Sequence, residues 1–142
     1  MPERLSVVID PNVLVSAVLT DGTARRVLDL VRSGAVRMIS CPHLHGELEG
    51  VLVRDRFLRW RTREDLDRYV ADLRVIAFQV PDPLDVPSVT RDPSDDYLVA
   101  LAKAAKADVL CSGDGDLEDV NEVAVLSPRA LVNRVNEDRR TT

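Results

Sequence analysis

Cysteine is scarce in this chain, which contains only Cys41 and Cys111 and no Cys-x-x-Cys pair. This spacing excludes a disulfide framework, and we expect both thiols to be free and buried in a reducing compartment. Long apolar runs are also missing, because none approaches the ~20 residues that span a bilayer. No signal-peptide pattern precedes the first apolar run. These absences predict a cytoplasmic protein.

Several catalytic signatures are missing as well. The sequence contains no glycine-rich phosphate loop, no Ser–His–Asp or Cys–His arrangement, no internal repeat and no low-complexity segment. Its 142 residues suit one folded domain, which we place at residues 1–137, followed by a polar C-terminal tail at 138–142. The net charge of −5 argues against nucleic-acid binding through bulk charge. Acidic metal ligands would themselves lower this count, so a local basic groove stays open as an alternative.

Apolar runs of strand length alternate with helical patterns along the chain. Residues 5–9 are apolar and rich in β-branched side chains, as expected of a strand buried on both faces. Further strands are expected at 36–40, 75–80, 108–112 and 123–126, with helices beginning near residues 11, 23, 42, 63, 94 and 127. The alternation predicts an α/β fold in which helices flank a central parallel β-sheet of about five strands.

Aspartates stand where these elements begin or end. Asp10 follows the first strand, Asp114 and Asp116 follow the strand at 108–112, and Asp96 lies at the start of a helix. Ligands of parallel sheets bind beyond the carboxyl ends of the strands, so we expect these acids to meet at one edge. Clustered carboxylates repel one another unless a cation lies among them, and a divalent metal is the usual solution. Each acid alone has a simpler explanation, because Asp also caps helices and builds turns.

Three motifs, in this order, resemble those of PIN-domain nucleases. They are residues 7–17 (VVIDPNVLVSA), 91–102 (RDPSDDYLVALA) and 107–117 (ADVLCSGDGDL). The resemblance extends over essentially the whole chain. It is closest to the stand-alone, VapC-like bacterial PIN proteins that are classed as toxins of toxin–antitoxin pairs. It implies a three-layer PIN-like fold around the predicted sheet.

The resemblance also implies a set of site residues. The catalytic acids would be Asp10, Glu47, Asp96 and Asp114. The metal ligands would be Asp10, Asp96, Asp114 and Asp116, with Asn12 and Ser112 as supporting polar residues. Glu49 is the alternative to Glu47, but the two lie roughly 200° apart around a helix, so both cannot point into one site. The sequence departs from the family at Pro11, where Thr or Ser is usual, which removes a hydroxyl and a backbone donor but no acidic ligand.

For function, the resemblance implies a ribonuclease that depends on Mg²⁺ or Mn²⁺ and leaves a 5′-phosphate and a 3′-hydroxyl on its RNA substrate. It also implies a homodimer and a cognate antitoxin protein as partner. One alternative is a catalytically silent PIN scaffold that only binds a protein or RNA partner, which the change at Pro11 keeps open. Another is a receiver-like signalling domain, which is disfavoured because no lysine follows a predicted strand and Pro11 replaces the second acid of the expected pair.

The segment from residue 54 to 63 is the one dense basic stretch of the sequence. We interpret it as a surface for single-stranded RNA, in which arginines bind phosphates and Phe57 and Trp60 stack on bases. The arginines in question are Arg54, Arg56, Arg59 and Arg61. The alternative is a solvated surface with two aromatic rings in the core. A zinc site at His43, His45 and Glu47 is disfavoured, because His45 points away from the other two on a helix.

Overall fold

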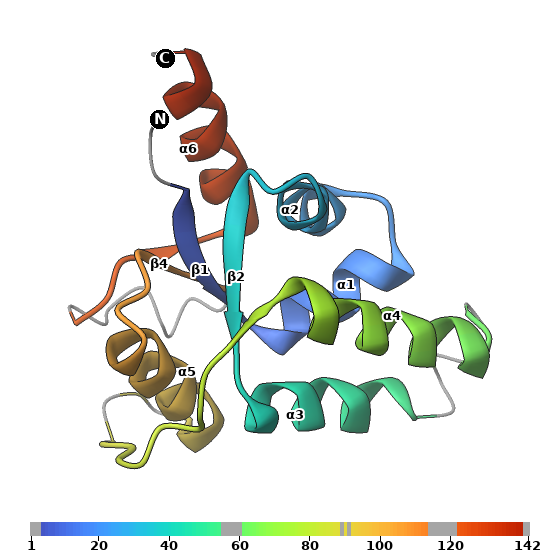
Figure 1. Ribbon diagram of the computed structural model, residues 1–142, viewed down its shortest axis with the longest axis horizontal. Helices are drawn as coiled ribbons and strands as arrows, with labels where there is room; N and C mark the ends of the chain where they lie inside the picture. Colours follow the sequence, from blue (N-terminus) through green and yellow to red (C-terminus); the bar gives the residue numbers. More distant parts are fainter. Residues whose placement is uncertain (1–3, 55–60, 89, 91, 114–121, 141–142) are drawn as a thin grey trace.

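The computed structural model describes residues 4–54, 61–88, 90, 92–113 and 122–140. Within this part of the chain, six helices flank one five-stranded sheet (Figure 1). The strands are β1 (Leu5–Ile9), β2 (Val36–Ser40), β3 (Phe78–Gln79), β4 (Val109–Cys111) and β5 (Val125–Leu126). All four strand pairs are parallel, in the order β3-β2-β1-β4-β5. The predicted α/β fold is confirmed.

The helices surround the sheet in two groups. They are α1 (Pro11–Leu19), α2 (Thr23–Arg32), α3 (Pro42–Leu52), α4 (Arg63–Ile76), α5 (Pro93–Ala104) and α6 (Pro128–Arg140). Helix α1 packs against α2 and α3, α3 packs against α4, and α6 packs on α2. Helix α5 contacts β1 and β4 and lies apart from the first group in Figure 1.

The core lies where β1, β2 and β4 meet these helices. Val7, Val8 and Ile9 of β1 are fully buried, as are Leu110 of β4 and Leu44 of α3. A central strand of a parallel sheet is covered on both faces, which explains the apolar run from Val7 to Ile9. Burial of each such side chain stabilises the fold by about 1.5–3 kcal/mol. This packed centre holds the carboxyl ends of β1 and β4, and the predicted acid Asp10 directly follows β1.

The third expected strand, at 75–80, is mostly wrong. Helix α4 continues to Ile76, and only Phe78–Gln79 pair with β2. The backbone N–H of Ala77 still donates to the carbonyl of Leu73, so the helical ladder runs through the apolar residues that suggested a strand. Val75 is 84% exposed and lies in the last turn of α4 rather than in a sheet. An edge strand has one pairing partner, so β3 is short.

The C-terminal helix is longer than expected. Helix α6 runs to Arg140, so residues 138–140 are helical although we had assigned them to the polar tail. Asp138 pairs with Arg134 one turn earlier, with 3.8 Å between the nearest oxygen and nitrogen. Such pairs support an exposed helix by a few tenths of a kcal/mol. Among the described residues, no helix is long and apolar enough to cross a membrane.

Candidate active site

Asp10 stands at the carboxyl end of β1, next to the end of β4. Its backbone N–H donates to the carbonyl of Cys111 at 2.9 Å, which joins it to the neighbouring strand. Its side chain is 4% exposed and caps helix α1, because Oδ1 accepts the N–H of Asn12 at 3.0 Å. The other oxygen, Oδ2, accepts the hydroxyl of Ser112 at 2.9 Å. Both carboxylate oxygens are therefore held in fixed directions.

The two predicted supporting residues both contact Asp10, but in different ways. Ser112 is buried directly after β4 and contributes its side-chain hydroxyl. Asn12 contributes only its backbone N–H, and its side chain is exposed. Each carboxylate oxygen has a second lone pair, so these hydrogen bonds orient Asp10 without using all of its capacity as a ligand. Pro11 fits as the first residue of α1, where a missing N–H has no cost.

Glu47 of α3 reaches toward α5 and contacts Tyr97. The Tyr97 hydroxyl donates to Glu47 Oε2 at 2.6 Å, and the tyrosine ring meets the ring of His43 edge-on at 4.3 Å between centroids. Glu49 lies on another side of the same helix and pairs with Arg74 at 3.4 Å. Of the two glutamates, Glu47 is therefore the one directed toward α5, the helix that carries Asp96.

Tyr97 links Glu47 to the charge of Asp10. Burial is the main reason why the pKa of Tyr97 is raised far above its usual value. The hydrogen bond and negative charge of Glu47 raise the pKa further, and so does the charge of Asp10. The phenol therefore remains a hydrogen-bond donor throughout the physiological pH range. Both carboxylates therefore act on the same phenol, Glu47 through a hydrogen bond and Asp10 through its charge.

Tyr97 was missed by the sequence analysis. Its sequence signal is a polar aromatic residue directly after Asp95-Asp96, in a helix that is otherwise aliphatic on its buried side. That signal does not reveal the partner, because Glu47 lies 50 residues away and meets Tyr97 only through the packing of α3 and α5.

Asp96 lies in the first turn of α5 and is 5% exposed. Its Oδ1 accepts two hydrogen bonds from Thr90, one from the backbone N–H and one from the hydroxyl, each at 2.7 Å. These bonds fix the loop before α5 to the helix and hold the carboxylate in place. Thr90 was also missed, because a single threonine in a proline-rich loop has no distinctive pattern.

The remaining predicted acids, Asp114 and Asp116, lie outside the described residues. Among the residues that the structure does describe, no group of three His, Cys, Asp or Glu side chains is arranged to hold a metal ion. The predicted metal ligands among the described residues, Asp10 and Asp96, are nevertheless carboxylates, as is Glu47, and carboxylates suit hard cations such as Mg²⁺ and Mn²⁺. Negative charges of Glu47 and Asp10 act on one buried region. The chemistry of these donors therefore fits a divalent cation.

The histidines and cysteines do not add ligands to this arrangement. His45 is 3% exposed, and its Nε2 lies 3.0 Å from the side-chain nitrogen of Gln79, away from His43 and Tyr97. Burial raises the pKa of Cys41 to about 11 and that of Cys111 to about 12, and the negative charge of Asp10 contributes at Cys111. Both thiols are free and buried, as the sequence predicted.

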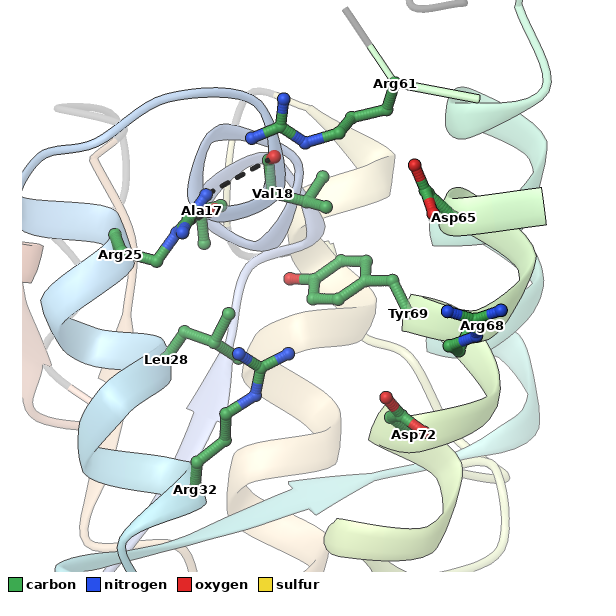
Figure 2. A pocket seen from close by; sticks show the side chains of 10 residues that line it. All are labelled: Ala17, Val18, Arg25, Leu28, Arg32, Arg61, Asp65, Arg68, Tyr69 and Asp72. Atoms are coloured by element: carbon green, nitrogen blue, oxygen red, sulfur yellow. Dashed lines mark hydrogen bonds between the residues drawn. The ribbon is translucent and has the colours of Figure 1, made fainter. Parts of the chain in front are cut away.

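The basic segment is described only in part, because Arg56, Arg59, Phe57 and Trp60 lie outside the described residues. Arg54 is exposed just after α3, and Arg61 lines a cavity of about 260 Å³ between α1, α2 and α4. Figure 2 shows Tyr69 pointing into this α1–α2–α4 cavity, with arginines from both α2 and α4 around it. The arginines that line it are Arg25, Arg32, Arg61 and Arg68. The Tyr69 hydroxyl donates to the carbonyl of Leu14 at 2.7 Å.

A family model described as PIN domain matches residues 6–116, which is most of the chain. The chain belongs to the PIN domain family. PIN domains are generally nucleases, and they generally use divalent metals such as Mg²⁺. The matched segment includes Asp10, Glu47 and Asp96 as well as the two acids outside the described residues.

Solved structures agree with this PIN fold. A chain in the crystal structure of VapBC2 from Rickettsia felis bound to a DNA fragment from their promoter is 9% identical, with a TM-score of 0.64. The match covers 87% of this chain and 98% of that one. PAE2754 from Pyrobaculum aerophilum is 13% identical, also with a TM-score of 0.64, and the match covers 94% and 90% of the two chains. No curated protein matches in sequence. At these identities the likeness concerns the fold.

Proposed function

We propose that this PIN domain is a metal-dependent endoribonuclease that hydrolyses phosphodiester bonds of RNA. The observation that carries the proposal is the orientation of Asp10, which is buried at the carboxyl edge of the sheet and held through both oxygens. Glu47 and Asp96 are fixed on the neighbouring helices by Tyr97 and Thr90. Such restraint suits acids that must hold a cation and a water in one geometry.

In this proposal the acids hold Mg²⁺ or Mn²⁺. The assigned metal ligands are Asp10, Asp96, Asp114 and Asp116, and Glu47 is assigned as a further catalytic acid. When bound, the metal supplies an acidified water and neutralises charge that develops on the phosphate. Ser112 and the backbone N–H of Asn12 keep Asp10 in one orientation, and Tyr97 does the same for Glu47. Asp10, Ser112 and Tyr97 are buried, which limits the competition of bulk water for their hydrogen bonds.

An RNA cleavage experiment tests both the substrate and the metal dependence. Purified protein is incubated with end-labelled single-stranded RNA, or DNA of the same sequence, in Mg²⁺ or Mn²⁺ and in EDTA. We expect RNA fragments with a 5′-phosphate and a 3′-hydroxyl, and no cleavage in EDTA. Products that end in a 2′,3′-cyclic phosphate would contradict the mechanism. Metal binding without cleavage would favour the silent scaffold instead.

We also propose that the protein is the toxin of a toxin–antitoxin pair, acts in the cytoplasm and forms a homodimer. The structural likeness to a chain of the VapBC2 complex supports this role. The α1–α2–α4 cavity, with its arginines and the apolar residues Val18 and Leu28, offers a surface for the antitoxin. Dimerisation is tested by sedimentation, which should give twice the chain mass of 15.8 kDa.

Growth of a bacterial culture tests the toxin role separately from the nuclease activity. Induced expression of the wild type should stop growth, whereas expression of Asp10→Asn to the same level should not. Unimpaired growth with an active, well-expressed nuclease would point to ordinary RNA processing rather than toxicity.

A further inference from the structure

A second cavity lies at the opposite edge of the sheet from Asp10. It has a volume of about 440 Å³ and is lined where α2 ends, where β1 and β2 begin, and where α4 gives way to β3. Arg4 precedes β1, Arg32 ends α2, and Arg37 lies near the start of β2. In Figure 1 this edge is at the top, near the N-terminus, whereas α3 and α5 lie at the lower end of the sheet. We call this second cavity the amino-edge cavity.

The charge of the amino-edge cavity is one-sided. Arg4, Arg32 and Arg37 line it, and among the described residues no acidic side chain does. None of the three forms an ion pair with a residue that the structure describes, although other arginines of the chain pair with Asp or Glu. A basic residue at the C-terminus of α2 is favourable for the helix dipole, which explains Arg32 alone. Arg4 precedes β1 and Arg37 lies in β2, so the helix dipole does not explain why they gather at this cavity. The net charge of −5 does not explain it either.

An aromatic ring fixes one of these arginines. The Arg37 guanidinium lies 3.9 Å from the centre of the Phe78 ring, a cation–π contact that restricts an otherwise flexible side chain. Phe78 remains 49% exposed, so part of its ring is open to a further stacking partner. Arginines beside an exposed aromatic ring are the combination that binds the phosphates and bases of single-stranded nucleic acid. An acidic peptide would use the arginines but would not need the ring.

We infer that the amino-edge cavity binds the phosphate backbone of single-stranded RNA and holds the substrate at a distance from the cleavage site. The inference rests on the proposed ribonuclease function. Strand β3 lies at the free edge of the sheet, and its Phe78 is level with Ile39 near the end of β2, so the cavity extends from the start of β2 toward the carboxyl edge. A five-residue strand such as β2 spans roughly 17 Å at about 3.3 Å per residue. That length corresponds to roughly five stacked nucleotides at about 3.4 Å each.

Binding of labelled RNA in EDTA tests the inference without cleavage. We compare the wild type with Arg37→Glu, Arg4→Glu and Phe78→Ala. Arg26→Glu is the matched control, since Arg26 is exposed on α2, lines neither cavity and undergoes the same charge change. For an RNA of about 15 nucleotides, each glutamate variant should raise the Kd about tenfold and reduce the slope of log K against log salt by about 0.7. Phe78→Ala should weaken binding with a smaller change in slope.

RNA length provides an internal control. A dinucleotide, with one phosphodiester bond, is too short to reach both edges of the sheet, so the same variants should change its cleavage in Mn²⁺ far less than that of the longer RNA. Thermal unfolding shows whether each variant is folded. Equal loss of affinity in Arg26→Glu and Arg37→Glu would indicate a general charge effect and overturn the inference.

Other outcomes separate this inference from the proposed function. If the wild type cleaves RNA and all variants bind it equally well, the amino-edge cavity is not an RNA site, but the ribonuclease proposal stands. If the wild type neither binds nor cleaves RNA, both proposals fail. If polyglutamate displaces RNA as effectively as unlabelled RNA does, the arginines form a site for acidic protein segments, and the RNA assignment is wrong.

Discussion

At the scale of single residues, Asp10 combines a structural and a proposed catalytic position. Its carboxylate caps α1 through the N–H of Asn12, which is the simple explanation of an aspartate before a helix. The same carboxylate accepts the hydroxyl of Ser112 from the neighbouring strand end. A cap alone does not require this second contact. The structure therefore shows the cap and a second, oriented contact, and the role of Asp10 as a metal ligand stays a prediction.

Tyr97 provides the sharpest test of how the acids are positioned. Tyr97→Phe removes only the hydroxyl that donates to Glu47 Oε2, so we expect RNA cleavage and Mn²⁺ affinity to fall about 10- to 100-fold. Tyr69→Phe is a matched control, because Tyr69 also buries a hydroxyl with one acceptor, the carbonyl of Leu14. That control should lose about 1–3 kcal/mol of unfolding free energy and retain cleavage. Equal cleavage by Tyr97→Phe and the wild type would contradict the positioning role.

Ser112 tests the orientation of Asp10. Ser112→Ala removes the hydroxyl donor to Oδ2 and leaves the cap from Asn12 intact, so we expect cleavage to fall about tenfold while the folded structure persists. Isothermal titration with Mn²⁺ should show weaker binding. Ser112→Thr keeps a hydroxyl and should recover part of the loss. An alanine variant with wild-type cleavage and metal affinity would mean that the hydroxyl is not needed.

At the scale of elements, His45 joins α3 to β3 and makes stability depend on pH. Burial, followed by the charge of Arg74, lowers the pKa of His45 below its ordinary value of 6.5. The unfolded chain therefore binds a proton at a higher pH than the folded chain does, and this contribution to stability is complete above about pH 6.5. It is lost as the pH falls below that value toward the folded pKa.

Thermal unfolding between about pH 5 and pH 8 measures this effect of His45. We expect the Tm of the wild type to decrease below about pH 6.5, and His45→Gln to show a smaller decrease over the same range. Gln79 and Arg74 remain in both proteins, so the difference isolates the imidazole. The same pH dependence in both would show that His45 does not cause it.

The helices and strands also show which element bounds could be predicted from the sequence. The predicted strands at 5–9 and 36–40 match the structure at both ends, and the helix predicted to begin near residue 23 begins at Thr23. Their apolar periods are long and bounded by clear start and stop residues, such as Gly34 after α2. The strand at 75–80 failed because Val75 and Ile76 fit either a strand or a helical turn. Continuation of the α4 hydrogen bonds decided between the two.

The candidate site was predictable only where local patterns determine it. Asp10 and Asp96 stand at element boundaries, and Glu47 was preferred over Glu49 through the resemblance to PIN-domain nucleases. Their roles as metal ligands remain predictions. Thr90 and Tyr97 could not be predicted, because each contact depends on how a loop or another helix packs onto α5. Such long-range packing leaves no periodic signal in the sequence.

At the scale of the whole molecule, burial protects both thiols. The pKa of Cys41 is about 11 and that of Cys111 about 12, so only about one thiol in a thousand, or fewer, is ionised near pH 8. We expect the native protein to react negligibly with a disulfide reagent at that pH, and the unfolded protein to expose two reactive thiols. Absorbance of the released thiolate measures both. Rapid reaction of the native protein would contradict the packing of β4 and of the start of α3.

The whole account depends most directly on Asp10, and a single-turnover cleavage assay of Asp10→Asn tests it. Asparagine is also a good N-cap, so the variant should keep the wild-type Tm while it loses the negative charge. With RNA and Mn²⁺ we expect the cleavage rate to fall at least about a hundredfold. Cleavage at the wild-type rate by a separately purified, folded Asp10→Asn protein would contradict the assignment of the active site to this edge of the sheet.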